Sequence, residues 1–165
     1  YRGSSQAQQR QTVAIDHRRD LVQRGVDFCF HTDTEVLLEG LRHYSTPFLN
    51  KIDGMWAIAY YDKKQCSLML SRDIMGARHI FYRVLGDELL FDSEPLPILA
   101  DAGRPEDIDA LALACSLRYL SAPSGRTLVQ GLKRLLPGHN LEVTVGAAPR
   151  EREGEGRQLT PLRRA

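Results

Sequence analysis

Residues 54–62 read Gly-Met-Trp-Ala-Ile-Ala-Tyr-Tyr-Asp, a nearly unbroken apolar run that ends in a charged residue. A polar stretch, Lys63-Lys64-Gln65, follows it, and a second, mostly apolar run then covers residues 66–70. Two short apolar runs joined by a polar turn are typical of a β-hairpin. The sequence therefore predicts a hairpin within residues 54–72.

A second pair of apolar runs, at residues 80–85 and 88–91, is joined through Gly86-Asp87 and predicts another hairpin within residues 79–92. Consecutive hairpins make the strand pairing antiparallel. Strands that are apolar on both sides are expected to be covered on both faces. The pattern favours an α+β protein, with two antiparallel sheets stacked on one another and helices outside.

Helices and a short strand are predicted before these hairpins. A short amphipathic helix fits residues 13–24 and would end at Gly25. The alternation of Val26, Phe28 and Phe30 suggests a short strand.

Thr32 and Glu35 have the spacing of a capping box, which predicts that a helix begins there. That helix would end before Pro47 and carry an apolar stripe made of Val36, Leu37, Leu38, Leu41 and Tyr44.

The C-terminal half predicts two more helices and a last strand. Ser93 is expected to cap a short helix that runs to Leu99, and residues 107–120 are expected to form a longer one. One face of the longer helix would carry Ile108, Leu111, Ala112, Cys115 and Tyr119. The last strand is expected at residues 141–145. These patterns divide the chain into a polar segment at 1–12, a folded domain at 13–146 and a charged, disordered tail at 147–165.

Composition excludes several classes of function. The net charge of +1 gives no electrostatic reason to expect nucleic-acid binding, and no apolar run approaches the roughly 18 residues of a membrane span. The three cysteines, Cys29, Cys66 and Cys115, are widely spaced and lie in or beside apolar stretches. We therefore expect buried free thiols, a reducing cytoplasmic location and no metal site.

Four segments, taken in order, resemble the glutamine-hydrolysing domain of asparagine-synthetase-type amidotransferases. They are Thr32-Asp33-Thr34-Glu35, Asp53 to Asp62, the pattern Arg72-Asp73 with Gly76 and Phe81-Tyr82, and Phe91-Asp92-Ser93-Glu94. Ala122-Pro123 and Leu136-Pro137-Gly138-His139 resemble the stretch that ends this domain. The resemblance covers about residues 15 to 145 and implies an N-terminal-nucleophile hydrolase with an αββα sandwich, here incomplete at its N-terminus.

The resemblance also implies site residues. Asp33 matches the aspartate that holds the amino group of glutamine; the alternative is that it only complements the dipole of the helix it begins. Thr12 and Val13 fall on the family's Asn-Gly oxyanion-hole pair and would lack its side-chain donor. The first residue is Tyr1 where the family has its nucleophilic cysteine, and the glutamine-binding arginine has no counterpart. We expect no catalytic residue in this chain, and structural roles for Arg72, Asp73, Glu94 and His139.

Three functions stay open at this stage. The chain could be part of an amidotransferase whose parent makes asparagine or a secondary-metabolite amide, a non-catalytic module that partners a synthetase domain, or a binding domain for a small amino acid. No Ser-Gly-Gly-x-Asp-Ser phosphate loop occurs in the sequence, so ATP and magnesium are expected only in a synthetase domain outside it. The nucleophilic cysteine, the oxyanion side-chain donor and the glutamine-binding arginine have no counterpart, so we expect the chain as given to be inactive toward glutamine, the family's substrate.

Overall fold

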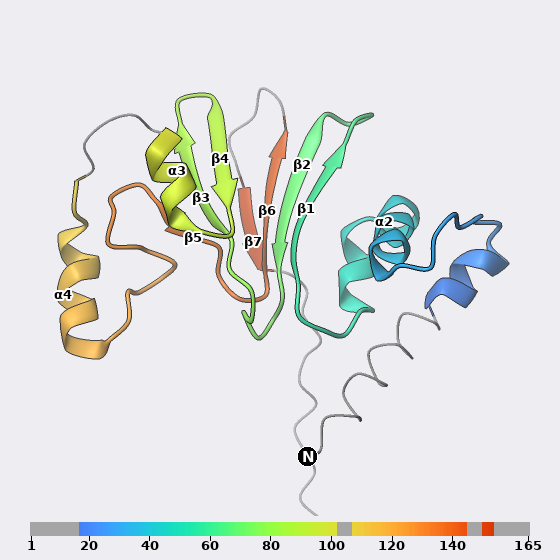
Figure 1. Ribbon diagram of the computed structural model, residues 1–165, viewed down its shortest axis with the longest axis horizontal. Coiled ribbons are helices and arrows are strands. Elements are labelled where there is room, and N and C mark those ends of the chain that lie inside the picture. The colour runs from blue at the N-terminus through green and yellow to red at the C-terminus, as the bar shows by residue number, and fades with distance from the viewer. Residues whose placement is uncertain (1–16, 102–106, 145–149, 154–165) are drawn as a thin grey trace, which may run out of the picture. The chain divides into compact units, whose positions relative to one another are not determined.

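The computed structural model describes residues 17–101, 107–144 and 150–153. The described residues divide into two compact units, one up to Gly54 and the other from Met55 onward; Figure 1 shows the elements of both. Each unit is described by itself. No helix among the described residues has the length and apolarity needed to cross a bilayer.

The first unit is helical. Its described part begins with a helix at residues 17–23, which ends before Gly25, a glycine with φ of +85°. Helix α2 spans Asp33–Tyr44 and the 3-10 helix η1 spans Thr46–Asn50. The buried apolar side chains of this unit are Leu21, Val26, Val36, Leu41, Phe48 and Leu49.

Gly40 explains how α2 and η1 pack. The ring of Phe48 lies so close to Gly40 that any Cβ at this position would overlap it. Phe48 can therefore rest directly on the backbone of α2, and its ring stacks on that of Tyr44 with centroids 6.0 Å apart. The predicted helix is confirmed, and its stripe is buried at Val36 and Leu41.

The predicted strand at Val26, Phe28 and Phe30 is wrong, because residues 26–30 form a loop. The amide of Val26 donates to the carbonyl of Leu21, and the other hydrogen bonds found for this backbone among the described residues are with side chains and not with another strand. The amides of Cys29 and Phe30 donate to the carboxylate of Glu35. Alternating apolar residues thus lie in a loop that side chains hold in place.

The second unit contains two antiparallel sheets. Both predicted hairpins are confirmed: β1 (Ala57–Asp62) pairs with β2 (Ser67–Arg72), and β3 (Phe81–Leu85) pairs with β4 (Glu88–Asp92). The larger sheet has the order β1-β2-β6-β7, with β6 at His139–Thr144 and β7 at Arg150–Glu153. The smaller sheet has the order β4-β3-β5, with β5 at Lys133–Arg134.

Both sheets contribute to one core. Leu70 and Leu141 of the larger sheet pack with Tyr82 of the smaller sheet, and Ile80 and Leu135 complete the cluster. The Tyr82 hydroxyl donates to Glu151 on β7 over 2.8 Å, and burial together with this bond raises the pKa of Tyr82. The phenol therefore stays protonated at neutral pH and joins the two sheets.

The helices of this unit cover little of the sheets. Helix α3 (Pro95–Asp101) packs on β3 and β4, as Figure 1 shows. Coverage on both faces is wrong for β1, where Ala57, Ala59 and Tyr61 are exposed. The apolar face predicted for residues 107–120 is also largely exposed: helix α4 spans Ala110–Tyr119 and buries only Ala112.

The segment predicted as a disordered tail from residue 147 contains strand β7. Its residues Arg150–Glu153 pair with β6 in regular antiparallel register. Charged residues are tolerated there because β7 lies at the edge of the larger sheet.

Candidate functional site

Asp33 is the first residue of α2, and its side chain is exposed. Thr32 caps the helix, since its Oγ1 accepts a hydrogen bond from the backbone amide of Glu35 over 3.3 Å. An exposed carboxylate on a fixed first turn can meet a cationic group from solvent. The same position complements the positive end of the helix dipole.

Glu35 fixes the loop that leads into this turn. Its two carboxylate oxygens accept the backbone amides of Cys29 and Phe30 over 2.7 and 2.8 Å. Thr32 therefore plays its part in the predicted capping box, while the carboxylate of Glu35 binds amides of the preceding loop.

Arg18 holds the other side of the same loop. Its Nη1 donates to the carbonyl of Phe30 over 2.9 Å, and its guanidinium lies 4.2 Å from the centre of the Phe28 ring. The loop beside Asp33 is thus tied to both helices that flank it. Sequence analysis missed Arg18 and this use of Glu35, since neither contact follows from helical spacing.

The three thiols are not buried as predicted. Cys29 and Cys66 are exposed, Cys115 is half-buried, and all three are free. Cys29 lies in the loop held by Glu35, and Cys66 has a positive φ of 47° in the turn between β1 and β2. Cys115 belongs to α4, which buries little. The apolar neighbours that suggested a core are themselves in loops or on an exposed helix.

Thr12 and Val13, the positions matched to the oxyanion hole, lie outside the described residues. The structure therefore places Asp33 alone among the substrate-binding residues expected from the sequence.

In the second unit, Arg72 and Asp73 hold the turn after β2, which agrees with the structural role expected for them. Both side chains are buried. The guanidinium of Arg72 donates to the carbonyls of Arg78, Leu135 and Gly76 over 2.6, 2.6 and 2.7 Å. Asp73 accepts the amide of Ala77 over 3.2 Å. Sequence patterns do not signal this burial, because a charged pair at a strand end is usually solvated.

His79 receives a fourth hydrogen bond from Arg72. The Nη2 atom of Arg72 lies 2.8 Å from Nδ1 of His79. Since the guanidinium can only donate, Nδ1 must be the unprotonated nitrogen of a neutral ring. Loss of water on this side and the charges of Arg72 and Arg134 lower the pKa of His79.

A cavity of about 560 Å³ lies beside His79. Its lining also includes Arg78, Ser93 and Glu94, together with residues 55–57 and 77. Glu94 comes directly before α3, close to its predicted place in the first turn. His139, expected to be structural, donates from Nδ1 to the carbonyl of Pro137 over 2.9 Å.

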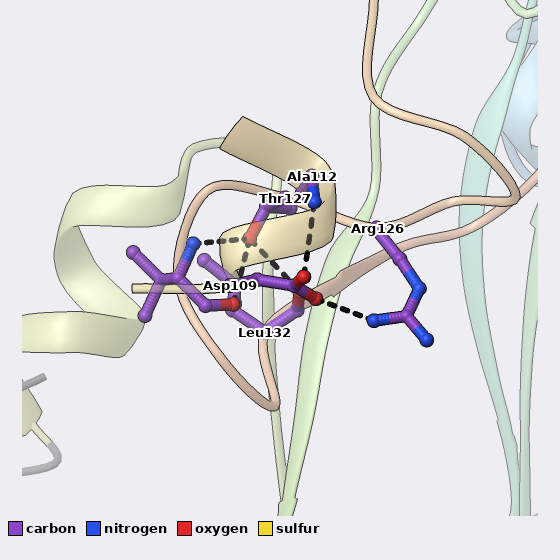
Figure 2. Close-up of polar contacts among 6 residues, drawn as sticks. Asp109, Ala112, Arg126, Thr127 and Leu132 are labelled. Atoms are coloured by element: carbon purple, nitrogen blue, oxygen red, sulfur yellow. Dashed lines mark hydrogen bonds and ion pairs between the residues drawn. The ribbon is translucent and has the colours of Figure 1, made fainter. Parts of the chain in front are cut away.

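A second polar network holds the start of α4 (Figure 2). Asp109 caps the helix by accepting the amide of Ala112 over 3.0 Å, and it pairs with Arg126 over 2.6 Å. These contacts lower the pKa of Asp109, the Ala112 amide most strongly. The Thr127 hydroxyl accepts the amide of Val129 over 3.2 Å, and its single proton can be donated to the carbonyl of Leu132, 2.9 Å away, or to that of Val129, 3.1 Å away.

A cavity of about 640 Å³ lies beside this network, with Lys133, Arg134 and Glu151 in its lining. Cations and anions both line it, and Asp109 and Arg126 pair with each other. The network therefore positions α4 and offers no reactive group. In the part of the chain that the structure describes, no group of three or more His, Cys, Asp or Glu side chains could hold a metal ion.

The fold is of the α+β class, with two antiparallel sheets in the second unit. The candidate ligand-binding group is the exposed carboxylate of Asp33 in the first unit, and the described residues contain no metal cluster. Residues 15–152 match the protein family described as "Glutamine amidotransferase domain", and the chain belongs to this family.

The chain is similar to asparagine synthetase [glutamine-hydrolyzing] 1 and 3 of Bacillus subtilis (strain 168). The identities are 30% and 33%, each over 129 residues, which cover 78% and 76% of this chain. It is also 29% identical over 138 residues to "Amidase chyE" of Penicillium rubens, covering 84% of this chain. The matches cover 20%, 21% and 19% of the three relatives, so the chain spans about a fifth of their length.

A solved structure supports the fold alone. Glutamine phosphoribosylpyrophosphate amidotransferase from B. subtilis, complexed with ADP and GMP, superposes with a TM-score of 0.55 at 18% identity. The similarity covers 85% of this chain and 26% of that protein. The comparisons support the predicted α+β sandwich and the resemblance to the glutaminase domain of asparagine synthetases.

Proposed function

We propose that the chain is the glutamine-recognition part of a glutaminase domain, and that the parent protein uses the released ammonia to make an amide. The observation that carries this proposal is the family match over residues 15–152, within which Asp33 begins helix α2 on a fixed turn. The relatives named above as glutamine-hydrolysing asparagine synthetases support asparagine as one product.

The chemistry assigns Asp33 a binding role. Glutamine carries an ammonium group, and the exposed carboxylate of Asp33 can pair with it. The ties from Thr32 and Glu35 keep the first turn of α2 in place while the ligand binds. An exposed ion pair contributes only about 0–1 kcal/mol, so we expect dissociation constants no better than the high millimolar range for the 165-residue chain.

The 165-residue chain is proposed to bind glutamine without hydrolysing it. Amide hydrolysis by this route needs an activated nucleophile and preorganised oxyanion donors. Among the described cysteines, Cys29 lies nearest to Asp33 in the sequence and is exposed, but its backbone amide is committed to Glu35. The resemblance gives it no catalytic role.

The first test is binding. Backbone amide resonances of Asp33 and Thr34 are followed by NMR while glutamine is added to the full chain. We expect shifts that grow with glutamine concentration and that Asp33→Asn abolishes. The matched control Asp27→Asn, also at an exposed aspartate of this unit, should leave them unchanged. Equal binding by Asp33→Asn would overturn the role of Asp33.

The second test is turnover. Glutamate released from glutamine is measured with the wild-type chain and with Cys29→Ser. We expect release at the uncatalysed rate in both. Release above this rate that disappears in Cys29→Ser would identify Cys29 as a nucleophile and contradict the proposed inactivity.

The second candidate is a non-catalytic module that packs against a synthetase domain or subunit. The replacement of the family's Asn-Gly pair by Thr12 and Val13 favours it, since a module without catalysis needs no side-chain oxyanion donor. The parent's ATP and magnesium would then bind outside this chain. Three free cysteines fit a cytoplasmic location.

A further inference from the structure

Three polar side chains form a row along the cavity of about 640 Å³ in the second unit. Lys133 of β5 lies directly opposite Tyr82 of β3 on one side, and an isolated antiparallel bridge places it opposite Arg126 on the other. Residues directly opposite each other in antiparallel pairs share one face of the sheet. The phenol of Tyr82, the ammonium of Lys133 and the guanidinium of Arg126 therefore stand on the same face.

An acid lies at each end of this row. At one end Asp109 pairs with Arg126 over 2.6 Å, as Figure 2 shows. At the other end Glu151 accepts the hydroxyl of Tyr82 over 2.8 Å. Because the phenol is neutral, this bond leaves the negative charge of Glu151 uncompensated, and no cation pairs with it in the described part of the chain.

Lys133 is the cation of the row that lacks an acid. Its ammonium has no ion-pair partner among residues 17–101, 107–144 and 150–153, and its neighbour across the bridge is a second cation, Arg126. Like charges directly opposite one another in a sheet are destabilising. An anion that accepts hydrogen bonds from both side chains removes this repulsion. The cavity thus offers an uncompensated positive charge and an uncompensated negative charge to a ligand.

Apolar side chains form another part of the cavity wall. Ile108 and Leu111 both line it, and they are 66% and 54% exposed. The backbone holds this wall in place, since Ile108 forms a bridge with Val129 and the amide of Asp109 donates to the carbonyl of Leu128 over 3.0 Å. A ligand with an apolar group gains free energy by covering these side chains. A cavity of this volume is in the usual range for a small-molecule site.

We propose that this cavity binds a free amino acid with a large apolar side chain. The carboxylate of the ligand accepts hydrogen bonds from Lys133 and Arg126, and its ammonium group donates to Glu151. Its side chain covers the apolar part of the wall. A zwitterion meets both uncompensated charges at once, whereas a simple anion brings a second negative charge toward Glu151. The site lies in the second unit, so it does not depend on the glutamine recognition proposed for the first.

The test is titration of the 165-residue chain with L-phenylalanine, followed by NMR. We expect saturable shifts of the backbone amides of residues 108–111 and 130–134. Lys133→Gln should weaken binding at least about tenfold, because a hydrogen bond between charged groups is lost. The matched control Lys64→Gln changes an exposed lysine in the turn between β1 and β2, and it should bind as the wild type does.

Two further variants test the other contacts. Glu151→Gln keeps an acceptor oxygen for Tyr82 but loses the charge that meets the ammonium group, so it should also weaken binding. Leu111→Ala removes part of the apolar wall and should weaken binding of L-phenylalanine. Leu117→Ala, at an exposed leucine of the same helix that does not line the cavity, should leave binding unchanged.

Two results would overturn the proposal. One is equal binding of 3-phenylpropanoate, which has the carboxylate and the ring but no ammonium group. The other is no saturable shift with L-phenylalanine at these amides, including the case in which inorganic phosphate shifts them in its place. Both results come from the wild-type chain, so they remain decisive if a variant fails to fold. Asp33→Asn should lose the glutamine-induced shifts and keep those caused by L-phenylalanine, which separates the two sites.

Discussion

In each unit one charged side chain holds a loop in place. The two side chains, Glu35 in the first unit and Arg72 in the second, carry opposite charges and lie in different surroundings. Glu35 accepts two backbone amides from residues five and six positions away, and it is half-buried. Arg72 donates to three carbonyls, one of them 63 residues away in the sequence, and it is only 4% exposed.

Glu35 holds only one short loop, whereas Arg72 connects segments that are far apart in the sequence of the second unit. Removing Glu35 frees one short loop, whereas removing Arg72 leaves carbonyls from two distant segments without their donor. An unpaired polar group costs more where water cannot replace the lost partner. We therefore expect the same kind of substitution to have a global effect in one unit and a local effect in the other.

The largest effect is expected for Arg72→Met. The substitution keeps much of the side-chain volume but removes the donors to Gly76, Arg78 and Leu135. We expect the free energy of unfolding of the second unit to fall by at least about 3 kcal/mol, because each buried carbonyl left without its donor costs about 1–3 kcal/mol. Urea unfolding followed by fluorescence of Trp56, the single tryptophan, measures it, because its indole donates to Ser71 in the same unit.

The control for this prediction is Arg24→Met. Arg24 pairs with Asp20 on the surface of the first unit, so its loss should cost no more than about 1 kcal/mol. A similar, small effect for Arg72→Met would contradict the role of Arg72 as the support of the turn after β2.

A smaller, local effect is expected for Glu35→Gln. The amide side chain offers one acceptor oxygen, and its NH₂ group cannot accept the second backbone amide. Hydrogen exchange at Cys29 and Phe30 should accelerate roughly tenfold, while exchange in the buried part of α2 stays unchanged.

Glu39→Gln is the matched control. Glu39 lies on the same helix and pairs with Arg42 of that helix over 2.7 Å, so this ion pair does not involve the loop. Its substitution should leave Cys29 and Phe30 unaffected. Unchanged exchange in Glu35→Gln would show that Arg18 alone suffices to hold the loop.

The sequence predicted the hairpins because each strand pairs with its neighbour in the chain, so runs such as residues 54–62 carry the signal. It also placed the start of α2, since Thr32 acts within three residues. It failed at residues 26–30, where alternating apolar residues occur without a partner strand. It failed again at β7, where charged residues are tolerated because this strand lies at the edge of the sheet beside β6.

The site was less predictable for the same physical reason. Asp33 could be proposed from a local motif, but the support around it comes from Arg18, fifteen positions earlier. Burial of Arg72 depends on Leu135, which no local pattern connects to it. Contacts of a long side chain with backbone atoms leave no periodic signal, because any residue offers the same carbonyl.

The smallest expected effect concerns pH and refines the comparison at Arg72. His79 accepts a hydrogen bond from Arg72 only while its ring is neutral, and its folded-state pKa lies below the ordinary value of 6.5. At pH values below 6.5 but above the folded pKa, the unfolded chain binds a proton at His79 that the folded chain does not. Stability contributed by the neutral ring is therefore complete above the unfolded pKa and is lost as pH falls through the folded pKa.

We expect the urea midpoint to fall more between about pH 7 and about pH 5 in the wild type than in His79→Asn, whose side-chain oxygen can still accept from Arg72. His43→Asn, at the last turn of α2 in the other unit, should keep the wild-type slope. A titration of the His79 ring by NMR with a midpoint at or above the ordinary value would contradict the neutral acceptor, because a ring that charges so readily could not remain bonded to the guanidinium.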